Sequence, residues 1–254
     1  MTNFRGMQLG RLPYIPAQIA RAPQLEGRFQ VLAAPPWQLH RENILYRPGL
    51  DRNDVLGDCG AVGIANGARA EAALHGFSLD ISTERVVTLY ERFGYRPGVP
   101  ESDQGVRLLD VLTNQSQKAW LAEDQMPLTG PWATFDPQDR IMAAWVMSNV
   151  GWCYSGFDLA LADQEADVWD TATPASAGDP TPGSWGGHCA DELYYNGLED
   201  TDLVYIATWG KVHPATWRWV KSRKVETHAI LWRPVAGVDY ERLCADVASF
   251  VAGV

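Results

Sequence analysis

Residues 53–76 read NDVLGDCGAVGIANGARAEAALHG. Small and apolar side chains recur at spacings of three and four between Val62 and Ala73, which predicts a buried helix from residue 59 to about residue 76. Cys59 then lies in the first turn of that helix. A thiol at a helix N-terminus beside an imidazole has a lowered pKa and is nucleophilic as the thiolate. Although a lone cysteine opening an apolar helix is more often a core residue, this position makes Cys59 a candidate nucleophile.

His188 is the candidate partner of Cys59. It lies 129 residues further along the chain, follows two glycines and opens a strand-like run. A later strand-like segment, residues 205–210 (YIATWG), ends in Trp-Gly. Between Cys59 and His188, residues 103–105 (DQG) precede the helical pattern VRLLDVL. The order of these segments along the chain carries more weight than any one of them.

In this order, over residues 53–232, the segments resemble those of the papain family of cysteine peptidases. Residues 53–60 resemble its nucleophile segment, in which a glutamine six residues before the cysteine donates to the oxyanion; Asn53 stands there. Asp103-Gln104-Gly105 resembles the glycine pair that opens the helix lining the substrate cleft. Residues 185–188 resemble the histidine strand and residues 205–210 the Asn-Ser-Trp-Gly motif. The Cys59 to His188 spacing lies near the lower end of the roughly 130–150 residues typical of the family.

The resemblance implies an α+β, papain-like two-lobed fold, with a helical N-terminal lobe, an antiparallel β-sheet C-terminal lobe and a cleft between them. It implies Cys59 and His188 as the catalytic pair, with Asn53 and the backbone N–H of Cys59 holding the oxyanion. Trp209 is expected to pack over His188 and to shield it from water. The implied substrate-binding residues are Gln104, Gly105, Gly187 and Trp209.

Two departures from the family pattern bear on activity. The orienting asparagine of the family aligns with Ala207, which cannot accept a hydrogen bond from the His188 ring. Thr208 is the substitute candidate, but it is one position off and is expected to face the opposite side of its strand. Asn53 is shorter than glutamine by about one methylene, and a misplaced oxyanion donor costs about 10²–10³ in rate. The catalytic triad is therefore expected to be reduced to a dyad.

The rest of the chain completes this expectation. Residues 1–50 contain six prolines and no sustained periodicity, which predicts an extended arm lying across its own domain or reaching a neighbouring subunit. Residues 51–254 form the domain, with a helical lobe over about 51–149 and a β-rich lobe over about 150–254. Further helices are predicted after Ser82-Thr83, Gly105 and Asp136-Pro137, and a last one after an Asp239 cap. The predicted strands lie within residues 151–161, 188–196, 202–210 and 228–234.

Composition excludes several classes of function. The net charge of −10 repels phosphate backbones and anionic membrane surfaces, and we interpret the basic run at residues 218–224 as a solvated helix face. The first residues lack the apolar run of a signal peptide, and no stretch approaches a membrane span, so we expect a soluble, cytoplasmic protein. The sequence has no CxxC, HExxH or GxSxG motif, so no metal ion or cofactor is expected, and a serine hydrolase is disfavoured.

Two functions remain open. The first is a cysteine peptidase or hydrolase that cleaves peptide or isopeptide bonds in a peptide or protein substrate. The second is a catalytically weak or inactive papain-fold protein that serves as a building block of a larger assembly, with partners bound through the N-terminal arm. A phage virion, as a head, connector or tail component, is one such assembly and would place the protein in the virion.

Overall fold

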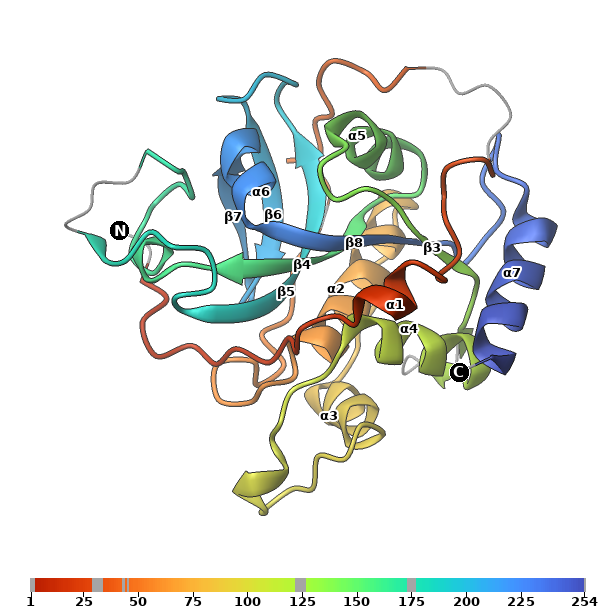
Figure 1. Ribbon diagram of the computed structural model, residues 1–254, viewed down its shortest axis with the longest axis horizontal. Coiled ribbons are helices and arrows are strands. Elements are labelled where there is room, and N and C mark those ends of the chain that lie inside the picture. Colours follow the sequence, from red (N-terminus) through yellow and green to blue (C-terminus); the bar gives the residue numbers. More distant parts are fainter. Residues whose placement is uncertain are drawn as a thin grey trace.

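The computed structural model describes residues 3–28, 34–42, 44, 46–121, 127–172 and 177–253 (Figure 1). Its helices, including the 3₁₀ helices η1 and η2, are α1 (Pro16–Ile19), α2 (Cys59–Leu74), α3 (Thr83–Glu91), η1 (Pro100–Ser102), α4 (Leu108–Gln117), α5 (Arg140–Asn149), η2 (Leu161–Asp163), α6 (Trp217–Arg223) and α7 (Tyr240–Ala252). Its strands are β1 (Trp120–Leu121), β2 (Pro127–Leu128), β3 (Trp132–Thr134), β4 (Cys153–Leu159), β5 (Gly186–Tyr195), β6 (Leu203–Thr208), β7 (Lys211–Thr216) and β8 (Lys224–Ile230). The predicted α+β class is confirmed.

Helix α2 is the central helix, and the sequence prediction of it is confirmed. It begins at Cys59 and is followed by Gly76, whose positive φ of 79° is typical of a helix end. Its glycines allow a close approach to the sheet: a Cβ added at Gly67 would lie 2.1 Å from the ring of Trp152, and one at Gly63 would lie 2.7 Å from Tyr154. The small residues of α2 therefore fix the position of Cys59 against the strands.

A six-stranded antiparallel sheet forms the other half of the molecule, in the order β3-β8-β4-β5-β6-β7. Each of the four predicted strands corresponds to one of its members. The sequence analysis missed β7, because Pro214 interrupts its pattern; β7 is an edge strand, where a residue without an N–H is tolerated. It also missed that Arg223 and Lys224, in the basic run, are buried in ion pairs with Asp163 and Glu192.

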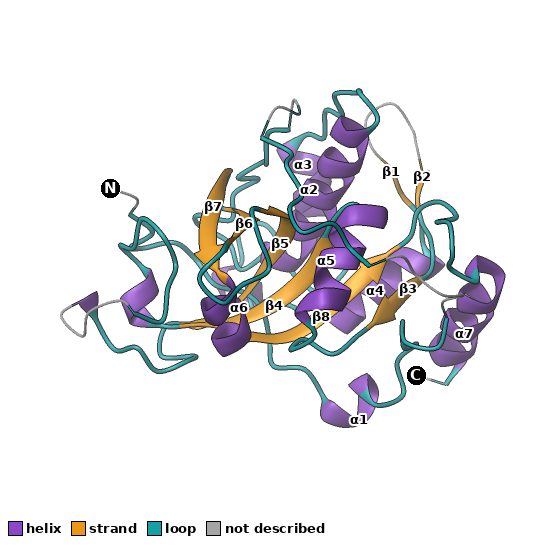
Figure 2. Cartoon of the chain, turned by 90° about the horizontal axis from the view of Figure 1, so that it is seen from above, coloured by secondary structure: helices purple, strands orange, loops and turns teal. Residues whose placement is uncertain are grey.

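Two hydrophobic clusters lie on the two sides of the sheet. One joins α2, α3 and α4 to the sheet, and the other joins α5 and α6 to it. Figure 1 shows α2, α3 and α4 on one side of β4 and β8, and α5 on the other. Residues 132–149, which the sequence assigned to the helical lobe, supply β3 and α5 to the sheet half, because five consecutive residues of α5 are buried there. Figure 2 shows α7 beside β3 at one end of the sheet.

The helix starts follow the sequence in part. Asp239 caps α7 as predicted, since its side chain accepts a hydrogen bond from the Arg242 N–H. Helix α5 begins three residues after Pro137, where Asp139 accepts from the Met142 N–H. Ser82 precedes α3, but its hydroxyl makes no capping hydrogen bond.

The N-terminal arm lies across its own domain. Its backbone pairs with Val106, Thr134 and Tyr195, and Phe4 is fully buried against Trp169 and Trp209. The short helix α1 interrupts it. Parts of the predicted arm, residues 1, 2, 29–33, 43 and 45, lie outside the described residues. What is described is a segment held to one domain by hydrogen bonds and buried apolar side chains.

Candidate active site

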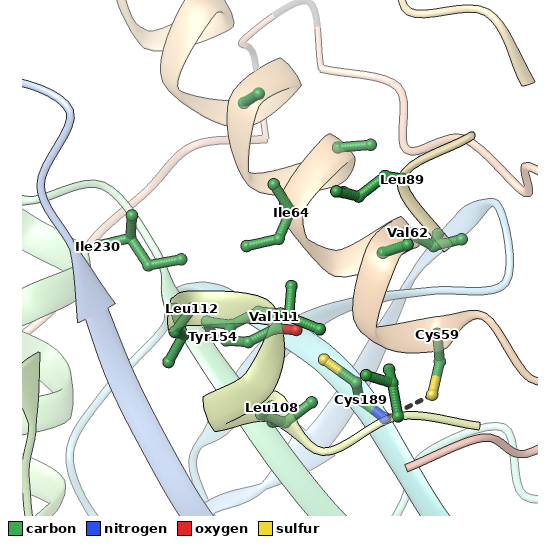
Figure 3. Packing of buried hydrophobic residues seen from close by; sticks show 14 of the residues in the cluster. Cys59, Val62, Ile64, Leu89, Leu108, Val111, Leu112, Tyr154, Cys189 and Ile230 are labelled. Atoms are coloured by element: carbon green, nitrogen blue, oxygen red, sulfur yellow. Dashed lines mark hydrogen bonds between the residues drawn. The ribbon is translucent and has the colours of Figure 1, made fainter. Parts of the chain in front are cut away.

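Cys59 lies where the first turn of α2 meets strand β5. Its side chain is buried, with the residue only 1 % exposed, and its Sγ accepts a hydrogen bond of 3.4 Å from the backbone N–H of Cys189 (Figure 3). Because Cys59 is the first residue of the helix, its backbone N–H has no acceptor within α2. The thiol and this N–H therefore lie at the same end of α2.

His188 is held from two sides. Its Nε2 lies 2.9 Å from Thr208 Oγ1, and its ring stacks on Trp209 with centroids 4.0 Å apart. Trp185 stacks on Trp209 in turn, 5.4 Å away, so three flat rings lie in a row. The other ring nitrogen, Nδ1, is buried and makes no hydrogen bond. The expected packing of Trp209 over His188 is confirmed, and the imidazole keeps one nitrogen uncommitted.

The contact between Thr208 and His188 corrects the expectation that Thr208 faces away. Strand pairing places Ala207 opposite Asp191. His188 lies an odd number of residues from Asp191, so it faces the other side of the sheet from both Asp191 and Ala207. Thr208, one residue after Ala207, consequently shares the face of His188. A side chain that binds the His188 ring therefore lies one residue further along the chain than the family pattern places it.

Residues 9–12, which we call the cleft segment, run across this site. The Arg11 N–H donates to the Gly187 carbonyl at 3.1 Å, the Val106 N–H donates to the Gly10 carbonyl at 2.8 Å, and the Leu12 N–H donates to the Val106 carbonyl at 3.0 Å. In Figure 1 the red N-terminal chain runs beside the sheet, where Arg11 pairs with Gly187 at the start of β5. The backbone of the protein itself thus occupies the groove between the two lobes.

Glycines allow the cleft segment to come this close. A Cβ added at Gly10 would lie 1.8 Å from the Gly57 carbonyl oxygen, two residues before Cys59. A Cβ at Gly105, whose φ is 74°, would lie 2.2 Å from the Gly10 oxygen, and one at Gly187 would lie 2.4 Å from the Arg11 oxygen. Two predicted substrate-binding residues, Gly105 and Gly187, therefore contact the cleft segment. Of the other two, Gln104 is exposed and its amide donates to the Glu101 carbonyl, whereas Trp209 stacks on the His188 ring.

Burial keeps both catalytic candidates neutral while the cleft segment is in place. Burial raises the pKa of the Cys59 thiol to about 11, against the smaller effect of hydrogen bonds from the Cys189 and Gly10 N–H groups. Burial, with a smaller contribution from the Arg11 guanidinium, lowers the pKa of His188 to about 3. The lowered thiol pKa expected from the helix N-terminus is thus absent in this state, because desolvation outweighs it.

Asn53 is turned into its own loop. It is buried, and its Nδ2 donates to the Leu56 carbonyl and to Asp58 Oδ1, both at 3.1 Å. Both N–H groups of the amide are engaged, so the oxyanion role predicted for Asn53 requires this loop to rearrange. Asp58 was missed by the sequence analysis. Burial raises the pKa of its carboxyl to about 8, with the Asn53 hydrogen bond acting in the opposite direction.

A second group missed from the sequence connects the two loops of the helical side. Asp103 accepts hydrogen bonds from the Gly57 N–H at 3.0 Å and from the Tyr90 hydroxyl at 2.7 Å. The Tyr90 oxygen accepts from the Gly105 N–H at 2.8 Å. The loop before Cys59 and the loop before α4 are therefore held together through one carboxylate.

Over the part of the chain that the structure describes, no three His, Cys, Asp or Glu side chains gather in a way that could hold a metal ion. None of the helices described is both long enough and apolar enough to cross a membrane.

Comparison with known proteins identifies the fold. No family model and no curated protein matches the sequence. Among solved structures, xylellain, a cysteine protease from Xylella fastidiosa, matches with a TM-score of 0.64 and 12% identity over 92% of this chain and 99% of that one. Procathepsin L 3 from the larval midgut of Tenebrio molitor matches with a TM-score of 0.52 and 11% identity, over 90% and 76%. The cysteine protease and lectin-like domains of Cwp84 from Clostridium difficile match with a TM-score of 0.53 and 10% identity, over 94% and 63%. The chain has the papain-like fold.

Proposed function

We propose that this papain-like chain is a cysteine hydrolase that cleaves peptide or isopeptide bonds with Cys59 and His188, and that the cleft segment keeps it latent. The observation that carries the proposal is the setting of His188. Thr208 binds Nε2, Trp209 fixes the plane of the ring, and Nδ1 is left without a hydrogen bond. The buried His213 and His228 also have ring nitrogens without a hydrogen bond, so His188 is distinguished by the combination of Thr208 on one nitrogen and Trp209 on the ring face, with the opposite nitrogen free.

The proposed chemistry begins with the hydrogen bond at Thr208. With the Thr208 oxygen accepting from Nε2–H, the neutral ring carries its proton on Nε2, and Nδ1 is free to act as a base. His188 takes the Cys59 proton as the sulfur attacks the substrate carbonyl carbon. The backbone N–H of Cys59 donates to the oxyanion. His188 then protonates the leaving amine, and water, deprotonated by the same ring, hydrolyses the thioester.

Departure of the cleft segment would change the charge state of the pair. Burial is the largest cause of both pKa shifts, so water entering the groove moves the thiol and the imidazole back towards their ordinary values. The Arg11 charge, which disfavours the imidazolium, leaves at the same time. The ion pair of thiolate and imidazolium then becomes accessible near neutral pH.

One observation favours a second candidate function. Cys59 and His188 are each 1 % exposed, and three backbone hydrogen bonds hold the cleft segment over them. A chain in which this segment never leaves would use the papain-like fold as a building block in a larger assembly, such as a phage virion.

Substitution of Gly10 separates the two functions. In Gly10→Ala the new Cβ would meet the Gly57 oxygen, so the cleft segment cannot sit in the groove, while Cys59 and His188 are untouched. We expect this full-length variant to hydrolyse mixed fluorogenic peptides, and Gln8→Ala, a change at an exposed position of the same arm, to remain as inactive as the wild type.

The controls are Cys59→Ala and His188→Ala in the Gly10→Ala background, each of which should abolish hydrolysis. A folded Gly10→Ala protein that cleaves no peptide, or cleavage that survives both substitutions, would reject the proposed hydrolase in favour of the building block.

A further inference from the structure

The side chain of Arg11 lies in an acidic pocket beside the groove. Its Nη1 lies 3.1 Å from Glu226 Oε1, and its Nη2 donates to Asp158 Oδ1. The Arg11 side chain is 3 % exposed and that of Glu226 is 2 % exposed, whereas the Asp158 side chain is 37 % exposed. Glu226 thus forms the floor of the pocket and Asp158 its rim.

Strand pairing and two glycines shape this pocket. Gly156 on β4 lies opposite Glu226 on β8, and Asp158 on β4 lies opposite Gly187 on β5. A Cβ added at Gly156 would lie 2.7 Å from Arg11 Cδ, and one at Gly187 would lie 3.1 Å from Arg11 Nη2. Glycine at these positions leaves the space that the arginine side chain fills. We call Gly156, Asp158, Gly187 and Glu226 the Glu226 pocket.

The two carboxylates of the pocket favour a positively charged ligand. Glu226 and Asp158 belong to the domain, whereas Arg11 belongs to the arm that must leave for the groove to open. A buried carboxylate that loses its partner is strongly unfavourable unless water or another cation replaces it. Two further titratable groups lie near this carboxylate: His228, with Nε2 3.5 Å from Glu226 Oε2, and Cys189, whose thiol pKa the Glu226 charge helps to raise. A guanidinium fits best, because its separate nitrogens reach both carboxylates at once.

The cleft segment also connects the pocket to the start of α2, where the Cys59 sulfur lies. Arg11 directly follows Gly10, whose Cα packs against Gly57, two residues before Cys59. The Arg11 N–H binds the Gly187 carbonyl, one residue before His188. In a substrate peptide that follows this path, the residue whose side chain enters the pocket lies one or two residues from the carbonyl carbon that Cys59 attacks.

We propose that the Glu226 pocket selects arginine, and less strongly lysine, at one or two residues from the bond that Cys59 attacks, and that Arg11 occupies the pocket as an internal substitute for this substrate side chain. The proposal rests on the proposed hydrolase function for its biological meaning. The recognition itself depends only on the pocket and can be measured without turnover.

Peptide binding tests the recognition. The probes are the peptide Gln-Leu-Gly-Arg-Leu-Pro, which has the sequence of residues 8–13, and the same peptide with citrulline, an uncharged isostere, in place of arginine. When each peptide is titrated calorimetrically into full-length Gly10→Ala protein, the arginine peptide should bind at least tenfold more tightly than the citrulline peptide. Glu226→Gln in that background should remove the difference in affinity between the two peptides. If that variant does not fold, Asp158→Asn, at the exposed rim, is used in its place and should reduce the difference. Equal affinities, or no binding of the arginine peptide, would overturn the proposal.

Cleavage distinguishes this proposal from the hydrolase function. Peptides carrying arginine, lysine, citrulline or leucine at each position should be cut by Gly10→Ala with kcat/KM highest for arginine at a single position. Cleavage without any basic preference would overturn the pocket and leave the hydrolase standing. Selective binding of the arginine peptide without any cleavage would reject the hydrolase and retain the pocket as a binding site for basic peptides.

Discussion

Two buried arginines in this molecule have different surroundings. Arg223 binds Asp163 through Nε and the Pro180 carbonyl through Nη2, and Asp163 also accepts from the Trp219 indole and the Ala160 N–H. The Arg11 Nε makes no hydrogen bond, although the Arg11 side chain is equally buried. The Arg223 pair joins neighbouring parts of one domain, whereas Arg11 brings its charge in from the arm. The first pair is part of the fold, and the second resembles a bound ligand.

The largest effect is expected at the Arg223 pair. Asp163→Ala leaves a buried guanidinium, an indole N–H and a backbone N–H without their shared acceptor, and should lower the free energy of unfolding by about 3–5 kcal/mol. Asp200→Ala, which removes an exposed partner of Arg140, should cost less than about 1 kcal/mol. Urea unfolding of both variants measures this. Equal costs would show that the Arg223 pair is not a structural element.

Arg11→Ala should have a smaller effect on stability and a larger one on reactivity. It removes two charge-assisted contacts from the arm, and water can fill the vacated space beside the buried Glu226, so a loss of about 1.5–3 kcal/mol is expected. At the same time Cys59 should become more reactive to iodoacetamide, because the cleft segment is released. Arg5→Ala, which breaks an exposed ion pair of the same arm, is the control and should change neither quantity. Lower stability without greater Cys59 reactivity would show that Arg11 does not hold the groove closed.

The pH dependence of stability follows from His188. Its pKa is about 3 in the covered site, below the ordinary value of 6.5, so between these values the unfolded chain binds more protons than the folded one. The His188 contribution to stability should therefore fall as the pH falls below about 6.5, by up to about 1.4 kcal/mol per pH unit, whereas Asp58, whose carboxyl pKa is raised to about 8, contributes in the opposite sense. His188→Gln should flatten the slope between pH 4 and 6.5, while the contribution of His213, whose pKa is also lowered, remains. An unchanged slope would place the His188 ring in contact with water.

Thr208→Val should have the smallest effect on the free energy of unfolding, but it should change the protonation of the His188 ring and so the catalytic rate. The loss of one hydrogen bond costs about 1 kcal/mol, and the His188 ring loses the partner that fixes its proton on Nε2. In the Gly10→Ala background, kcat should fall at least tenfold and its pH profile should shift, with Thr208→Ser restoring most of the loss. A purely structural Thr208 would lower stability without moving the pH profile.

The sequence predicts those parts of the molecule that carry a local pattern. Helix α2 was found from the spacing of its small residues, and the partnership of His188 with Trp209 from the order of motifs. Thr208 was placed on the wrong face because strand register depends on pairing with β5, which no local pattern encodes. Strand β7 was missed because of Pro214. The position of the cleft segment cannot be predicted from local patterns, because it depends on contacts with residues far away in the sequence. Gly10 contacts Gly57, and Arg11 pairs with Glu226 and Asp158.

The most direct test of the central claim is the rate at which iodoacetamide alkylates Cys59 near pH 7 in three full-length proteins. We predict that Gly10→Ala reacts at least a hundredfold faster than the wild type and Gln8→Ala, and that adding His188→Ala removes most of this gain. Mass spectrometry of the Cys59 peptide separates this reaction from that of the exposed Cys244. Equal rates in Gly10→Ala and the wild type would contradict the claim that the cleft segment holds a reactive pair in a neutral state.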